Sequence, residues 1–207
     1  MPPKYFELTF ILTLGALQPM MEMLFGTQIA TYYNGTAIVV VLAYVLLLIT
    51  RSPKDVWHTW GFRLDTLRVS IAPYALFSLA AVVTLYIYGW YKGNTPLPIG
   101  FWYVLTMYPL WGLAQQFVLQ NFVARNLITL IPSRTYRSLA TASIFACAHI
   151  PSVELFALTF IAGFLFTYLH AKYQNLLTLA VAHGILGALV FHLVLGQDQW
   201  KILAEYF

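Results

Sequence analysis

The chain has 207 residues, of which 60% are hydrophobic and only 9% are charged, with a formal net charge of +4. Soluble domains carry about 25% charged residues, so this composition excludes an ordinary soluble globular domain. The basic residues lie in loops between apolar stretches rather than on one exposed face, which argues against nucleic-acid binding. A single cysteine, Cys147, excludes an internal disulfide framework and any CxxC metal or redox motif.

Apolar stretches follow one another along the chain, and a helix needs about 20 apolar residues to cross a bilayer. We therefore predict one all-α domain over residues 1–207, a polytopic membrane helix bundle of about seven transmembrane helices. The first stretch ends in no small-residue cleavage site, so we expect it to be a span and not a signal peptide. The predicted spans are Tyr5–Phe25, Thr36–Thr50, Val69–Trp90, Phe101–Ile131, Ser138–Ile150, Val153–Ala171 and Leu176–Leu195.

The connecting segments carry their own signals. Gly26–Gly35 contains Gly, Thr and Asn and is predicted to be a turn. Aromatic residues beside cations in Arg51–Arg68 predict a short segment in the headgroup layer. Pro109 predicts a kink in the long fourth span, and Pro151 ends the fifth span, which is short for a full crossing.

Lysine and arginine residues are distributed unevenly between the two predicted sides of the membrane. Cytoplasmic loops carry an excess of such residues, so we expect the N-terminus inside and the C-terminus outside a plasma (inner) membrane. If the fifth span does not cross fully, the orientation of the later segments reverses. The N-terminal side holds Lys4, Arg51, Lys54, Arg63, Arg68, Arg134, Arg137 and Lys172, and the other side holds Lys92 and Lys201.

A small group of polar side chains falls inside the predicted spans. Such residues are costly in lipid and are functional-site candidates, although transmembrane amides also simply join neighbouring helices. Helical rise places Gln116, His149 and His183 at depths of roughly 22, 18 and 11 Å, so tilted helices could bring them together near the midplane. The group comprises Gln115, Gln116, Gln120, Asn121, His149 and His183, whereas Glu22, Glu154 and His192 are predicted to lie outside the site.

Three patterns in order resemble a known family. They are QQFVLQNFVARNL, then FACAHIP, and then GFLFTYLHAKYQNLLTLAVAHGILGAL, preceded by WGFR at Trp60–Arg63. Over residues 57–189 the chain is similar to the CAAX protease and bacteriocin-processing (CPBP, or Abi) family of glutamate-type intramembrane proteases. The resemblance implies a membrane endopeptidase that activates water with glutamates and histidines and stabilises the oxyanion with an Asn.

The motif positions differ from the family in chemically important ways. Gln cannot take up a proton at neutral pH, so both candidate glutamate bases are replaced by amides. The loss of the motif arginine is consistent with the loss of the carboxylates it would pair with. Carried over by position, Gln115 and Gln116 stand for the glutamates, Gln120 for the Arg, His149 and His183 for the histidines, and Gly187 for the Asn.

Two functions of different classes remain open. In a hydrolase of altered chemistry, neutral His149 or His183 is the base, while Gln115, Gln116 or Asn121 orients water and oxyanion. In a catalytically inactive relative, the same cavity binds a membrane peptide or a lipid-modified segment. Both functions imply contacts with membrane lipids and a peptide or lipidated-protein substrate, without nucleic acid, metal or cofactor. Haem ligation by the two histidines and transport are weaker alternatives.

Overall fold

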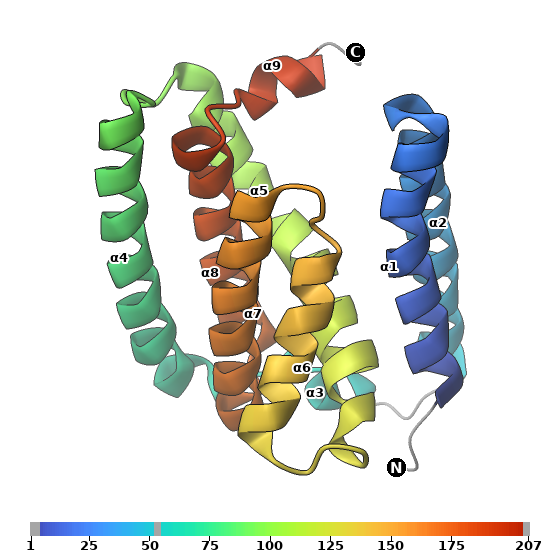
Figure 1. The fold of residues 1–207 in the computed structure, drawn as a ribbon. Helices are drawn as coiled ribbons and strands as arrows, with labels where there is room; N and C mark the ends of the chain where they lie inside the picture. The colour runs from blue at the N-terminus through green and yellow to red at the C-terminus, as the bar shows by residue number, and fades with distance from the viewer. Residues whose placement is uncertain (1–4, 52–54, 205–207) are drawn as a thin grey trace. The chain divides into compact units, whose positions relative to one another are not determined.

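The computed structural model describes residues 5–51 and 55–204, and within them helices are joined by turns without any strand (Figure 1). The predicted all-α membrane bundle is confirmed, and the chain is an integral membrane protein. Lys4 and Lys54, two of the cations used for orientation, lie outside the described residues. Five helices are long and apolar enough to cross a membrane, so the number seven is not confirmed: Tyr5–Phe25, Gln28–Arg51, Leu67–Lys92, Val153–Tyr173 and Leu176–Val194.

The first two helices differ in how well the sequence predicted them. Helix α1, Tyr5–Phe25, has the predicted bounds and accommodates Pro19. Helix α2 spans Thr27–Arg51, so the prediction of a turn over Gly26–Gly35 was wrong. Gly26 alone separates the helices, because its φ of 84° provides the left-handed residue that reverses the chain. Helix α3, Val56–Thr59, is a single turn inside the predicted interfacial segment.

The middle of the chain contains the largest departure from prediction. Helix α4, Leu67–Lys92, ends at Gly93 in the left-handed conformation. Helix α5, Ile99–Val118, contains Pro109 and passes directly into the π-helical turn η1, Leu119–Ala124, and the 3₁₀ turn η2, Asn126–Ile128. The prediction of one helical span from Phe101 to Ile131 was therefore wrong. The α-helical spacing of side chains ends at Val118.

The C-terminal part consists of helices with clear boundary signals. Ser133 caps α6, Arg134–Cys147, which starts earlier and ends earlier than the predicted fifth span and is not one of the five membrane-crossing candidates. Helix α7 spans Val153–Tyr173, α8 spans Leu176–Leu189, and α8 continues into the π-helical turn η3, Val190–Val194. A short helix α9, Gln199–Ala204, follows the last predicted span.

Contacts divide the chain into two compact units, and the prediction of one domain stays a prediction. Unit 1 comprises Met1–Trp60 and Val118–Tyr168. In it, α1 packs against α2, η1 and η2, and α6 packs against η1. Figure 1 shows α1 and α2 running side by side. The buried core of this unit consists of Leu8, Leu119, Val123, Leu127 and Phe145.

Unit 2 comprises Gly61–Phe117 and Leu169–Phe207. Helix α4 packs against α8 and η3. In the most apolar 18-residue stretch of the α8–η3 segment, 50% of the residues are buried. In the corresponding stretch of α2, 0% are buried. Helix α8 is therefore covered by protein to a greater extent than α2, which exposes its apolar side chains, as a helix facing lipid does.

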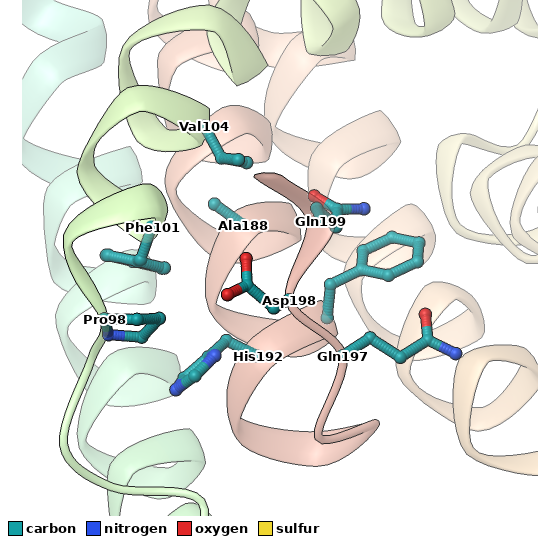
Figure 2. Close-up of a pocket in the computed structure, with 9 residues that line it drawn as sticks. Pro98, Phe101, Val104, Ala188, His192, Gln197, Asp198 and Gln199 are labelled. Carbon is teal, nitrogen blue, oxygen red and sulfur yellow. The ribbon is translucent and has the colours of Figure 1, made fainter. Parts of the chain in front are cut away.

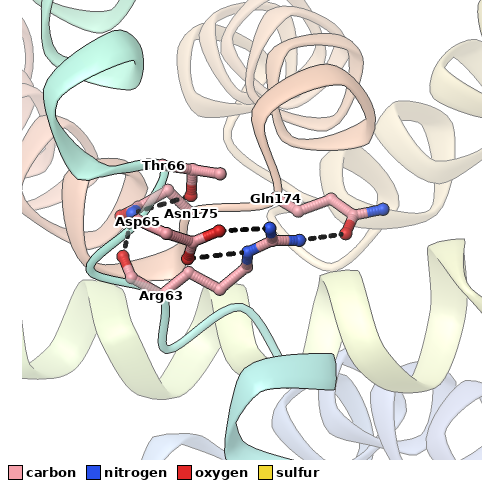
Figure 3. Close-up of polar contacts among 5 residues, drawn as sticks. All are labelled: Arg63, Asp65, Thr66, Gln174 and Asn175. Atoms are coloured by element: carbon pink, nitrogen blue, oxygen red, sulfur yellow. Dashed lines mark hydrogen bonds and ion pairs between the residues drawn. The ribbon is translucent and has the colours of Figure 1, made fainter.

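A polar cluster fixes the start of α8 in unit 2 (Figure 3). Asn175 accepts a hydrogen bond from the Thr178 backbone N–H at 3.0 Å and so caps the helix. Its Nδ2 donates to the Arg63 carbonyl oxygen at 2.5 Å, and Arg63 in turn pairs with Asp65. The Arg63 guanidinium also donates to Gln174 at 3.0 Å, and the hydrogen bond to Asp65 raises the pKa of Arg63. These contacts set where α8 begins, and hence where its later residues point.

Candidate active site

Helices α5 and α8 approach each other closely because glycines line their contact. A Cβ built on Gly184 would lie 2.6 Å from the Pro109 nitrogen, closer than real Cβ atoms come to other atoms. A Cβ on Gly112 would lie 2.9 Å from the Ala180 carbonyl oxygen and 3.0 Å from His183 Cδ2. Membrane helices use small residues in this way to bring their backbones together. The glycines thus make room for polar side chains of one helix to reach the other.

Gln116 and His183 meet across this contact in unit 2. Gln116 Nε2 lies 2.9 Å from His183 Nδ1. Both side chains are buried, with exposed fractions of 0% and 8%. An amide nitrogen only donates hydrogen bonds, so Nδ1 is the acceptor and the neutral imidazole carries its proton on Nε2. Gln116 therefore fixes His183 as a hydrogen-bond donor at Nε2.

His149 has the opposite arrangement in unit 1. It lies in the turn after α6, where Nδ1 is 2.7 Å from the Phe145 carbonyl oxygen. A carbonyl oxygen only accepts, so Nδ1 carries the proton and neutral Nε2 carries a lone pair. The imidazole also packs edge-on against the Phe145 ring, with centroids 4.8 Å apart. His149 is thus presented as an acceptor at Nε2, the complement of His183.

The amides that follow Gln116 have hydrogen-bond partners within unit 1. Gln120 and Asn121 lie in the π-helical turn η1. Gln120 Nε2 donates to Thr167 Oγ1 at 3.1 Å, and Asn121 Nδ2 donates to the Trp60 carbonyl oxygen at 3.2 Å. Both amides are buried and join segments of unit 1.

The remaining candidates have simpler surroundings. Within the described part of the chain, the half-buried Gln115 amide has no hydrogen-bond partner. Gly187 lies under the ring of Tyr108, which would meet a Cβ there at 2.7 Å. Glu22 accepts a hydrogen bond from Gln18 in its own helix at 3.4 Å. Glu154 is exposed.

A buried carboxylate, Glu7, is not among the residues predicted from the sequence. Glu7 on α1 is only 4% exposed. Tyr44 donates to its Oε1 at 2.6 Å, and Asn126 Nδ2 donates to its Oε2 at 3.0 Å. Asn126 also donates to the Phe122 carbonyl oxygen at 2.9 Å. The carboxylate of Glu7 in the first turn of an apolar helix could have predicted this cluster, because an acid inside a membrane segment needs hydrogen-bond partners.

The predicted site residues are distributed over both units. Gln120, Asn121 and His149 belong to unit 1, and Gln115, Gln116, His183 and Gly187 belong to unit 2. Their predicted meeting near the midplane stays a prediction. Among the described residues, no three His, Cys, Asp or Glu side chains gather as a metal site would require.

A comparison with protein families identifies the region that carries these residues. Residues 95–189 match the family described as type II CAAX prenyl endopeptidase Rce1-like. The predicted family is confirmed over this region. The Rce1-like region contains every predicted site residue, whereas the predicted extension of the resemblance to residue 57 stays a prediction. No curated protein and no solved structure matches the chain.

Proposed function

We propose that this Rce1-like chain is an intramembrane endopeptidase in which the two histidines, rather than glutamates, carry the reaction. The single observation that supports this best is the opposite hydrogen bonding of the imidazoles. His149 has its Nδ1 against a carbonyl oxygen, and His183 has its Nδ1 against an amide nitrogen. One ring therefore offers a lone pair at Nε2, and the other offers an N–H.

We propose that both groups act on one amide bond of the substrate, which water attacks. His149 Nε2 takes a proton from water while the water oxygen bonds to the carbonyl carbon, and the carbonyl electron pair moves to its oxygen. Nε2–H of His183 donates to that oxygen as its charge develops. The C–N bond then breaks as the imidazolium of His149 returns its proton to the leaving nitrogen. Gln116 acts as a positioning residue, since it holds His183 in the donor tautomer.

The substrate we propose is a membrane-associated peptide or a lipidated protein segment. The family description names a prenyl endopeptidase of CAAX sequences, which supports a peptide that is anchored in the bilayer. The uneven distribution of cations supports a plasma-membrane protein with its N-terminus in the cytoplasm and its C-terminus outside.

The cleavage assay uses purified protein in lipid nanodiscs with two internally quenched peptides. One carries a prenylated CAAX terminus, and the other is an unmodified transmembrane peptide. We expect cleavage of at least one, lost in His149→Ala and reduced about 100-fold in His183→Ala, as on removal of an oxyanion donor. His58→Ala, in the α3 turn, provides the histidine control. Equal turnover by wild type and His149→Ala would contradict the assignment of the base.

A non-catalytic peptide-binding protein is the second candidate. The buried amide of Gln116 at a glutamate position favours it, because an amide cannot serve as a base. If this candidate is right, the protein in the nanodiscs binds both peptides and releases no product. Product release by the wild type that His149→Ala abolishes would exclude it.

A further inference from the structure

The first turn of helix α6 in unit 1 carries two arginines and no acidic side chain. Arg134 is the first residue of the helix, and Arg137 follows it by three positions. Side chains at this spacing are neighbours on a helix, and like charges there repel each other. A helix also disfavours cations at its start, because that end of its dipole is positive. This pair of charges is therefore unfavourable for the helix on its own.

No carboxylate compensates these two charges. Within the described part of the chain, no ion pair involves Arg134 or Arg137, whereas Arg63 is paired with Asp65. Arg137 is half-buried, and burial together with the charge of Arg134 lowers its pKa. A guanidinium nevertheless stays protonated in proteins, so both positive charges persist.

Arg134 is held near the end of a helix that can cross the membrane. Its guanidinium carbon lies 4.0 Å from the centroid of the Tyr168 ring, and its Nη2 donates to the Tyr168 hydroxyl at 2.5 Å. Tyr168 precedes the end of α7 at Tyr173 by little more than one helical turn, a rise of roughly 8 Å. The headgroup region on each side of the hydrocarbon core is about 5–8 Å thick. Tyr168 therefore holds Arg134 close to the level of the headgroups.

Arg137 fastens the loop before α6 and keeps part of its guanidinium available. Its Nη1 donates to the carbonyl oxygens of Ile131 and Pro132, at 3.0 and 3.1 Å. Among the described residues, its Nη2 and Nε have no acceptor, and Arg134 uses only its Nη2. The N–H groups of a guanidinium match the oxygens of a phosphate. Tyr136, between the two arginines, is exposed, and aromatic residues beside cations suit the headgroup layer.

The small pocket of unit 2 offers no comparable place for an anion (Figure 2). It is lined by residues of α5, α8, η3 and the segment leading into α9, including Asp198. Its volume of about 10 Å³ is close to the minimum that one water molecule needs, so a phosphate group does not fit. The carboxylate of Asp198 would also repel an anion.

We propose that Arg134 and Arg137 form a binding site for the headgroup phosphate of an anionic phospholipid. Charge complementarity supports this ligand, because clustered cations beside a membrane-crossing helix attract anionic headgroups. A lipid fits better than a free phosphate, since the contact with Tyr168 sets the site at headgroup level. Leu130 and Leu139, which flank the arginines in the sequence, are exposed and can contact acyl chains. The inference does not depend on the chemistry of the candidate active site.

The test is native mass spectrometry of protein released from nanodiscs that contain equal amounts of phosphatidylglycerol and phosphatidylcholine. The wild type is expected to retain phosphatidylglycerol in preference. Each arginine beside an anionic headgroup contributes about five-fold in affinity, so Arg134→Gln should lower the preference about five-fold and Arg134→Gln/Arg137→Gln about 25-fold. Arg68→Gln is the matched control, because Arg68 is an exposed arginine in the first turn of α4 without a second arginine beside it. The control is expected to keep the wild-type preference.

Folding of the variants is checked by their melting temperatures in phosphatidylcholine nanodiscs. Arg137→Gln removes the hydrogen bonds to the loop, so Arg134→Gln, which leaves them intact, decides the outcome if the double variant does not fold. Equal retention of both lipids by the wild type, an unchanged preference in Arg134→Gln or an equal loss in Arg68→Gln would overturn the inference. A melting temperature raised by inorganic phosphate but not by phosphatidylglycerol would also overturn it, because the ligand would then be a free anion.

Discussion

Replacing Gln116 by Glu restores the residue type that the family resemblance expects, and we predict that it lowers activity. A carboxylate accepts hydrogen bonds and cannot donate one, so Nδ1 of His183 would have to carry the proton. His183 would then lose Nε2–H, the donor assigned to the oxyanion. Loss of one such donor costs about 10²–10³ in kcat, or roughly 3–4 kcal/mol.

The same substitution also tests the burial of the Gln116 side chain. Gln116 has an exposed fraction of 0%, so an ionised carboxylate there loses its hydration, at a cost of several kcal/mol. A charge-assisted bond to Nδ1–H returns about 1.5–3 kcal/mol. The net expectation is a loss of about 2 kcal/mol in the free energy of unfolding, visible as a lower melting temperature in detergent.

The assay compares wild type, Gln116→Glu and Gln28→Glu in nanodiscs. Gln28 lies on α2 with an exposed side chain, so its replacement adds the same charge without touching α5 or α8. We expect the control to cleave like the wild type and to melt at the same temperature. An increase of kcat in Gln116→Glu would refute the reasoning, because it would mean that position 116 needs a carboxylate and that His183 does not act as the donor.

Two further substitutions probe the framework around the candidate site. Glu7→Leu leaves the half-buried Tyr44 hydroxyl without its acceptor and should cost about 1–3 kcal/mol in the free energy of unfolding. An unchanged melting temperature would mean that the carboxylate does not stabilise the fold. Gly184→Ala places a methyl group against the Pro109 backbone and should cost about 1–3 kcal/mol, together with activity, because α5 and α8 must separate. Gly15→Ala, where a Cβ meets nothing within 4 Å, is the control, and an equal effect at both glycines would contradict the packing argument.

Hydrophobic length predicted the helices well, because a bilayer imposes one length on every crossing segment. Helix α1 has the predicted bounds, and α4, α7 and the continuous α8–η3 segment differ from their predicted spans by one or two residues at an end. The predicted bounds are wrong where local backbone geometry, and not the length of the apolar stretch, decides where a helix begins or ends. The π-helical turn at Leu119 has no composition signal, and the Asn34–Gly35 pair, which favours a turn in soluble proteins, lies inside α2.

The site could be predicted by residue type but not by contact. Intramembrane polarity singled out Gln116 and His183, and the structure joins them by a hydrogen bond. Which atom donates cannot be taken from the sequence, because it depends on how closely the glycines let α5 and α8 approach. Tyr108 was not singled out, since one tyrosine among many aromatic residues carries no signal until its ring is seen over Gly187.

The central claim is that the two histidines are held in opposite neutral tautomers, and ¹⁵N NMR of histidine-labelled protein in nanodiscs tests it most directly. His149→Ala and His183→Ala samples assign the two rings. The structure predicts a protonated Nδ1 and a bare Nε2 for His149, and the reverse for His183. A protonated Nδ1 on His183, or the same tautomer on both rings, would contradict the account.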